Sequence, residues 1–278
     1  MMDVHSDTAC ELGEGPLWHP QRNTLFWFDI LGSTLFCKGE TEEAWGFDEH
    51  VSAAGWVDQD TLLIASETGL WTFDIPTGEQ EFLAGLESDT SATRSNDGRA
   101  DPYGGFWIGT MGKEAEAYAG AIYRYYRGEV RRLFDRITIP NSICFAPDGR
   151  RAYYADTVSR RIKSVALDDE GWPTGKPSIF VDLREPELNP DGSVVDAEGN
   201  LWNAQWGAGR VACYAPDGTF LKAIDVPASQ TTCPAFGGAD LATMFVTSAA
   251  QGVDETQGGM TFAAQIGVTG QREHQVIL

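Results

Sequence analysis

A hairpin-like unit recurs along the chain and restricts the folds that the chain can adopt. Each copy has a short apolar run, a polar or Gly/Pro turn and a second run rich in aromatic residues. The copies read "GPLWHPQRNTLFWFDI", "AAGWVDQDTLLIASETGLWTFD", "GRADPYGGFWIGTM", "SICFAPDGRRAYYADT", "GSVVDAEGNLWNAQW" and, more weakly, "PAFGGADLATMFVTSA". Their turns begin near His19, Asp58, Asp101, Ala146, Asp196 and Ala239. Successive copies are therefore separated by roughly 40 to 50 residues, which is room for four short strands.

This repeat predicts an all-β fold, a six-bladed β-propeller with four-stranded blades around a central channel. We expect residues 1–278 to form a single domain of this kind. A pair of β-sandwiches would also have short strands and frequent turns, but the recurrence of one hairpin argues against it. We expect the N-terminal stretch "DTACEL" to close the ring by pairing with C-terminal strands such as "TFAAQIGV".

Charge and cysteine content limit the partners of the chain. A formal net charge of -21, from 41 Asp and Glu against 20 Lys and Arg, would repel phosphate backbones and anionic lipid headgroups. The start of the chain lacks the pattern of a secretory signal, and the 5 cysteines form no CxxC pair. We therefore expect a cytoplasmic monomer that binds a small molecule and neither nucleic acid nor membrane.

Polar residues occupy one register position in four of the repeats. The residues five positions before the turns at His19, Asp101, Ala146 and Asp196 are Glu14, Asn96, Asn141 and Asp191. Equivalent positions of a propeller converge on one end of its channel, and a set of carboxylate and carboxamide oxygens suits a hard divalent cation. Each residue alone also fits a turn. The shared register is what favours a central metal site.

Five segments in order resemble the motifs of the senescence marker protein/gluconolactonase family, also called regucalcin-like. The segments are "LGEGPLWHP", "RSNDGRADPYGGFWIGTMG", "IPNSICFAPDGRRAYYADT", "PDGSVVDAEGNLWNAQWGAGRV" and "FGGADLATMFVTSA". The resemblance covers nearly the whole chain and implies a six-bladed propeller that hydrolyses sugar lactones with one divalent metal. Ser142 and Ile143 depart from it, since many relatives have Gly and Leu there.

The resemblance also implies roles for individual residues. It places the metal ligands at Glu14, Asn141 and Asp191, and substrate contacts at Arg94 and Asn96. A further acidic substrate contact would match Glu114, in a loop that varies between members. The cofactor would be one divalent ion, and this ligand set accepts calcium, magnesium, manganese, zinc or ferrous iron.

An aldonolactone is a cyclic ester, and its opening needs a polarised carbonyl and an activated water. The metal would act as a Lewis acid, and we assign Asp191 as the general base because it is a carboxylate beside the metal. The expected substrates are lactones such as those of gluconic, xylonic, galactonic or arabinonic acid.

Two other functions remain open, namely a non-catalytic metal-binding regulatory protein and a promiscuous esterase or organophosphate hydrolase. Neither GxSxG nor HExxH occurs. Cys233 near the shared register is either a reactive thiol or a small residue lining the channel.

Overall fold

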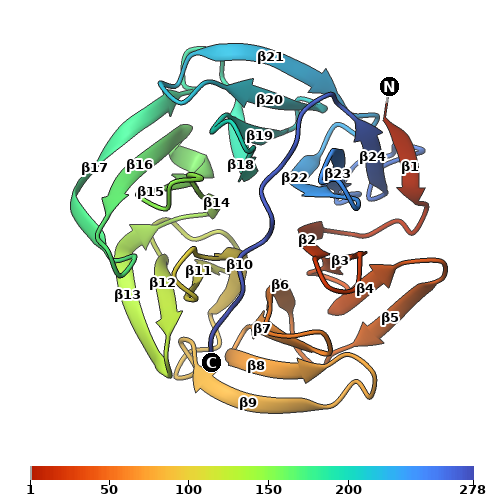
Figure 1. Cartoon of the computed structure of the whole chain (residues 1–278), viewed down its shortest axis with the longest axis vertical. Helices are drawn as coiled ribbons and strands as arrows, with labels where there is room; N and C mark the ends of the chain where they lie inside the picture. The colour runs from red at the N-terminus through yellow and green to blue at the C-terminus, as the bar shows by residue number, and fades with distance from the viewer. Residues whose placement is uncertain (1) are drawn as a thin grey trace.

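The computed structural model describes residues 2–278, and these form six four-stranded antiparallel sheets arranged as blades around an axis (Figure 1). The innermost strands are β2 (Gly13–His19), β6 (Val51–Trp56), β10 (Thr93–Ala100), β14 (Pro140–Phe145), β18 (Asn189–Val195) and β22 (Thr231–Gly237). The second strands are β3 (Thr24–Asp29), β7 (Thr61–Ser66), β11 (Phe106–Gly112), β15 (Arg151–Asp156), β19 (Leu201–Trp206) and β23 (Thr243–Ser248). The six-bladed propeller predicted from the repeats is confirmed.

The outer half of each blade completes the sheets. The third strands are β4 (Thr34–Lys38), β8 (Gly69–Asp74), β12 (Gly120–Tyr126), β16 (Arg161–Leu167), β20 (Arg210–Tyr214) and β24 (Thr261–Gln265). The outermost strands are β5 (Glu42–Gly46), β9 (Gln80–Gly85), β13 (Glu129–Ile137), β17 (Pro173–Asp182), β21 (Phe220–Asp225) and β1 (Asp3–Ser6). We number the blades 1 to 6 from the one that contains β2 to the one that contains β22.

Blade 6 closes the ring with strands from both ends of the chain. β1 pairs antiparallel with β24, so that Asp3 lies opposite Ala263 and Val4 opposite Phe262. The N-terminal part of the chain therefore closes the ring, as expected, but the pairing strand is β1 and not the predicted segment "DTACEL". Residues 7–12 follow β1 as the connection to β2, and within them Leu12 makes only an isolated bridge to Ala249.

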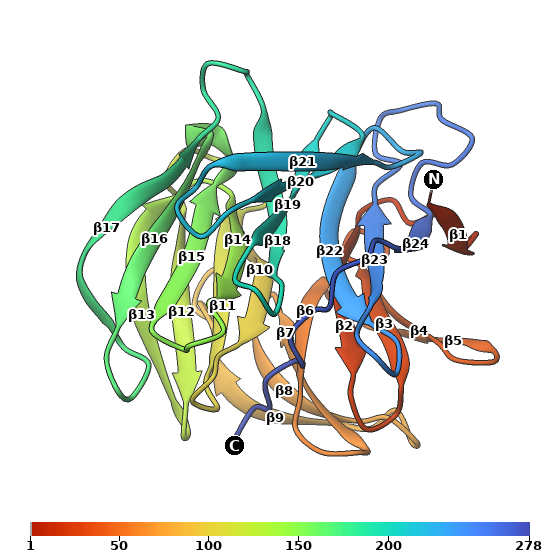
Figure 2. The same ribbon diagram turned by 45° about the horizontal axis from the view of Figure 1, so that its top comes forward.

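The innermost strands run in the same direction, as β2 and β22 show in Figure 2. Their first residues, together with the connections from the preceding blades, lie at one end of the channel, which we call the entrance end. The turns to the second strands lie at the opposite, far end. Aromatic side chains fill the space between and within blades, and Trp27, Trp107 and Trp202 are completely buried on β3, β11 and β19.

Helical structure is almost absent from residues 2–278, where one 3₁₀ turn, η1 (Thr157–Ser159), follows β15. No helix in this part of the chain has the length and apolar character needed to cross a membrane. All 5 cysteines are free and buried, as expected for small apolar residues in a core.

Candidate active site

Every innermost strand has an irregular register near its start. The pairing with the second strand shifts between Glu14 and Leu17, Val51 and Ala53, Ser95 and Gly98, Asn141 and Cys144, Pro190 and Ser193, and Thr231 and Pro234. An extra residue at such a bulge redirects the neighbouring side chains and bends the strand. These irregularities lie at the register position where the sequence predicts the site.

Glycines on both sides of Glu14 allow its strand to approach the neighbouring blades. Gly15 has a φ of +55°, a conformation in which glycine is favoured, and a Cβ there would clash with the carbonyl oxygen of Ser52. A Cβ on Gly13 would clash with the carbonyl oxygen of Ser248. The backbone N–H of Gly15 donates to Oε2 of Glu14 at 3.0 Å, which orients the buried carboxyl group.

A chain of hydrogen bonds joins the predicted residues of blades 3 and 4. Nη1 of Arg94 donates to Oδ1 of Asn96 at 2.8 Å and to the carbonyl oxygen of Ser95 at 2.9 Å. Nδ2 of Asn96 donates to Oδ1 of Asn141 at 3.2 Å and to the carbonyl oxygen of Pro140 at 2.9 Å. The three side chains are buried, so this network fixes their orientations.

The network continues into blade 5. Nδ2 of Asn141 donates to Oγ1 of Thr157 at 2.9 Å, and Oγ1 of Thr157 donates to the carbonyl oxygen of Pro190 at 2.7 Å. The next residue is Asp191, whose buried carboxyl group lies close enough to that of Glu14 for the charge of Glu14 to raise its pKa. Five of the six predicted site residues thus form a connected group across blades 1, 3, 4 and 5.

Burial and the charges of neighbouring carboxylates raise the pKa values of Glu14 and Asp191. Burial, followed by the charge of Asp97, raises the pKa of Glu14 to about 8. Burial, with the charges of Glu14 and Asp97, raises the pKa of Asp191 well above its ordinary value. Burial also lowers the pKa of Arg94 to about 10, although Glu14 and Glu67 oppose that shift. The Glu14–Asp191 pair therefore holds a proton in the absence of another positive charge.

The donor set fits a divalent cation. Two carboxyl groups and the carboxamide oxygen of Asn141 belong to one buried network, and oxygen donors of this kind suit hard divalent ions. The raised pKa values of Glu14 and Asp191 mean that positive charge between them, from a proton or a cation, would stabilise both groups. Within residues 2–278, no three His, Cys, Asp or Glu side chains form a metal-binding cluster.

Glu114 lies apart from this network. It is exposed in the connection between β11 and β12, and its backbone N–H donates to Oε2 of Glu116 at 3.1 Å. Among residues 2–278, its side chain has no hydrogen bond to the other five predicted residues. Its proposed contact with substrate stays a prediction.

Cys233 is buried next to Gly192, where a Cβ would clash with its Sγ. Burial raises the pKa of the Cys233 thiol well above its ordinary value. A protonated, enclosed thiol is a poor nucleophile, which favours the packing role for Cys233 over the reactive one.

Two further residues, to which the sequence alone assigned no role in the site, support it. Asp97 is buried beside Asn96 and accepts a 2.6 Å hydrogen bond from the backbone N–H of Ile143. Ser142 has a φ of 60°, and its hydroxyl donates to the carbonyl oxygen of Asp191 at 2.5 Å. Asp97 lies in the segment "RSNDGRADPYGGFWIGTMG", which resembles a family motif, so the sequence carried a signal for it. Nothing in the sequence foretold that Ser142 would bond to Asp191, which is 49 residues away.

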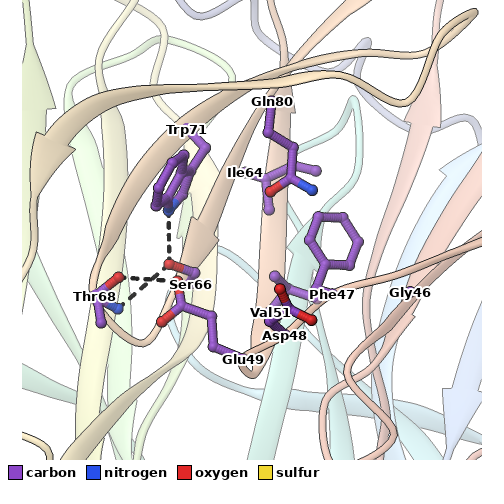
Figure 3. A pocket seen from close by; sticks show the side chains of 10 residues that line it. All are labelled: Gly46, Phe47, Asp48, Glu49, Val51, Ile64, Ser66, Thr68, Trp71 and Gln80. Carbon is purple, nitrogen blue, oxygen red and sulfur yellow. Dashed lines mark hydrogen bonds between the residues drawn. The ribbon is translucent and has the colours of Figure 1, made fainter.

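A pocket of about 460 Å³ lies away from the axis, in blade 2 and the connection from blade 1 (Figure 3). Its polar side chains already contact one another: Nε1 of Trp71 donates to Oγ of Ser66 at 2.9 Å, and Oγ1 of Thr68 donates to Oε1 of Glu49 at 2.9 Å. Since none of the six predicted site residues lines it, this pocket is separate from the network at the entrance end.

Residues 12–250 match the family model described as the SMP-30/Gluconolactonase/LRE-like region. The L-arabinolactonase of Azospirillum brasilense is 34% identical, over 94% of this chain and 90% of the relative. A pentonolactonase of Haloferax volcanii is 34% identical, over 96% of this chain and 95% of the relative. The solved structure of regucalcin, a calcium-binding protein of Agrobacterium tumefaciens strain C58, is 42% identical with a TM-score of 0.98, and the match covers 100% of this chain and 98% of that one.

Proposed function

Because the chain belongs to the SMP-30/gluconolactonase/LRE-like family, we propose that it is a sugar lactonase, which opens the cyclic ester of an aldonolactone to the free acid. The observation that carries the proposal is the pair of buried carboxyl groups of Glu14 and Asp191, next to a hydrogen-bonded chain that runs from Arg94 through Asn96 to Asn141. Relatives named L-arabinolactonase and pentonolactonase support the substrate class. The particular sugar is left to experiment.

Glu14, Asn141 and Asp191 are the residues that would hold one divalent cation. When bound, such a cation polarises an ester carbonyl and lowers the pKa of nearby water. The regucalcin neighbour, named as a calcium-binding protein, supports a divalent ion in this place and leaves its identity open.

Asp191 is the general base of this proposal. Its carboxylate takes a proton from the attacking water as the oxygen of that water adds to the lactone carbonyl carbon. When the bond between this carbon and the ring oxygen breaks, the proton passes from Asp191 to the ring oxygen. The products are a carboxylic acid and a hydroxyl group, so all atoms of water are accounted for. At a pH above its pKa, the carboxylic acid then loses its proton and becomes a carboxylate.

Arg94 and Asn96 would orient the lactone. Both hydrogen bonds of the Arg94 guanidinium within residues 2–278 use Nη1, which leaves Nε and Nη2 available to hydroxyl or ring oxygens of the sugar. Asn96 holds the guanidinium in place through Oδ1. A planar donor group fixed in this way reduces the entropy cost of positioning the substrate.

The test is acid release from a panel of aldonolactones, measured with a pH indicator against the spontaneous rate. The protein is first treated with a chelator and then supplied with calcium, manganese, magnesium or zinc chloride. We expect Asp191→Asn to lower kcat by at least about a hundredfold, since it removes the proposed base. Asp217→Asn is the matched control, because it is the same change in an exposed turn of the same blade.

Full activity of Asp191→Asn would contradict the assigned base. Full activity after exhaustive chelation would contradict the cation. A protein that binds cations but releases no acid above the spontaneous rate from any lactone would be a binding protein, the alternative that the regucalcin neighbour keeps open.

A further inference from the structure

The last residues of the chain close the far end of the channel. Residues 269–278, the closing segment, cross the middle of the ring from blade 6 in Figure 1. The backbone N–H groups of Val276 and Ile277 donate to the carbonyl oxygens of Trp56 and Gly104, each at 2.9 Å. Nε2 of Gln271 donates to the carbonyl oxygens at the ends of β14 and β18, at 3.2 and 3.0 Å. The closing segment thus contacts blades 2, 3, 4 and 5 at the end opposite the site.

Glu273 of the closing segment forms a buried ion pair inside the ring. Its Oε1 accepts a hydrogen bond from Nη1 of Arg99, and both side chains are almost fully buried. Nη2 of Arg99 also reaches the carbonyl oxygen of Ser193, at 3.4 Å. Burial pulls the pKa of Arg99 down, but Glu273, with smaller contributions that include Asp97, raises it overall. Arg99 is therefore a fixed positive charge in the channel.

Asp97 lies between this ion pair and the candidate site. It is on the same strand as Arg99, and its carboxyl group accepts a hydrogen bond from the backbone N–H of Ile143, two residues after Asn141. Burial raises the pKa of Asp97, and the charge of Arg99 opposes that shift. The charge of Asp97 in turn adds to the burial that raises the pKa values of Glu14 and Asp191. The buried ionisable groups linked by these contacts and charges are the four carboxyl groups of Glu14, Asp97, Asp191 and Glu273, and the two guanidinium groups of Arg94 and Arg99. With all of them ionised, two negative charges remain unbalanced, and one divalent cation would balance them.

We propose that Glu273 is a positioning residue that strengthens cation binding at the entrance end, because it occupies Arg99 and so leaves the negative charge of Asp97 available to the cation. This inference rests on the proposed cation site. It gives the closing segment a role in cation binding, although this segment contacts none of the three residues proposed to hold the cation.

The charge balance gives opposite signs for two single variants. Glu273→Gln removes a negative charge and frees Arg99 to neutralise Asp97, so cation affinity should fall, by roughly threefold to thirtyfold for charges separated within one channel. Arg99→Gln removes a positive charge and should raise the affinity over a similar range. The double variant Arg99→Gln/Glu273→Gln restores the wild-type charge balance, so its affinity should return close to that of the wild type.

The experiment is isothermal titration of chelator-treated, full-length protein with calcium chloride and, separately, with manganese chloride. Each variant is also melted without cation, to measure its stability. A purely structural role for the ion pair predicts that both single variants bind more weakly, whereas the charge mechanism predicts opposite signs. If one single variant does not fold, the other single variant and the double variant still differ by one charge and give the sign of its effect.

Equal affinities in all folded variants would overturn this inference while leaving the proposed lactonase intact. Weaker cation binding by both single variants would also overturn the role of Glu273 and leave the proposed lactonase intact. A wild-type protein that binds neither cation would overturn the cation site itself, together with the role of Glu273. The lactone assay on the same samples keeps these failures apart, because it reports hydrolysis independently of the titration.

Discussion

At the scale of single residues, the site depends on two carboxyl groups that are buried together. Glu14 and Asp191 are each about 5% exposed or less, so burial raises the pKa of both carboxyl groups, and the charge of Glu14 raises the pKa of Asp191 further. A protein core tolerates such a pair only if a proton or a cation supplies positive charge. A proton and a divalent cation therefore compete for the same place, which makes cation binding dependent on pH.

The first prediction follows from the sign of these pKa shifts. The pKa of Glu14 is about 8 in the cation-free fold, against 4.5 for the unfolded chain, so the folded state holds an extra proton between these values. Stability of the cation-free protein should therefore fall as pH rises from about 5 to 8, and cation affinity should rise over the same range. Thermal melts of chelated protein at several pH values, with and without calcium chloride, measure both effects.

Glu14→Gln is the control for this prediction, because it removes the titrating group and nearly keeps its shape. It should reduce the fall in melting temperature over this range without abolishing it, because Asp191, whose pKa burial also raises, is still present. Asp97, whose burial raises its pKa to about 6, adds a change of the same sign in the lower part of the range. A wild-type melting temperature that rises between pH 5 and 8 without cation would contradict the assignment.

At the scale of elements, ring closure depends on a short outer strand. β1 has four residues and covers the edge of β24 in blade 6, while Met2 beside it is 4% exposed and packs into the core of blades 5 and 6. Deletion of residues 1–6 should lower the free energy of unfolding by at least about 2 kcal/mol, the usual cost of losing one buried Met side chain. Denaturant titration measures this loss.

Asp7→Ala is a suitable comparison for the deletion, since Asp7 is exposed and lies just beyond β1. This substitution should leave the denaturant concentration at the midpoint of unfolding almost unchanged. If the deletion variant unfolded at the same denaturant concentration as the wild type, closure by β1 would contribute little to stability. The exposed edge of β24 should also make the deletion variant more prone to associate, which light scattering can follow.

The same elements show how far the sequence could predict this structure. The repeat predicted one shared register for four residues, namely Glu14, Asn96, Asn141 and Asp191. It could do so because each innermost strand begins the same hairpin and has an irregular pairing near its start. The closing strand was placed too far along the chain, because β1 is only four residues long and has no repeat partner to fix its position. A periodic pattern predicts repeated elements well and single ones poorly.

The closing segment is the clearest case of this limit. Glu273 meets Arg99 across 174 residues of sequence, and the segment around it contains no regular strand that a pattern could indicate. Its contacts depend on turns of four blades that come together only in the folded ring. Tertiary geometry alone brings this carboxyl group to the channel.

At the scale of the whole molecule, the net charge of -21 surrounds the channel with a negative field. Such a field attracts divalent cations, does not act on a neutral lactone, and repels the carboxylate that hydrolysis produces. The proposed reaction converts a neutral substrate into an anion, so the field favours release of the product.

The last prediction uses salt to separate these effects. Salt shortens the screening length from about 10 Å at roughly 0.1 M to about 3 Å at 1 M. With saturating cation, kcat/KM for a neutral aldonolactone should change less than about twofold over this range, because no long-range attraction guides the substrate. The apparent Kd for calcium should increase over the same range, and inhibition by the product acid should become stronger, since its repulsion is screened. Parallel titrations and initial rates in potassium chloride test all three outcomes, and a steep fall of kcat/KM with salt would show instead that the true substrate carries positive charge.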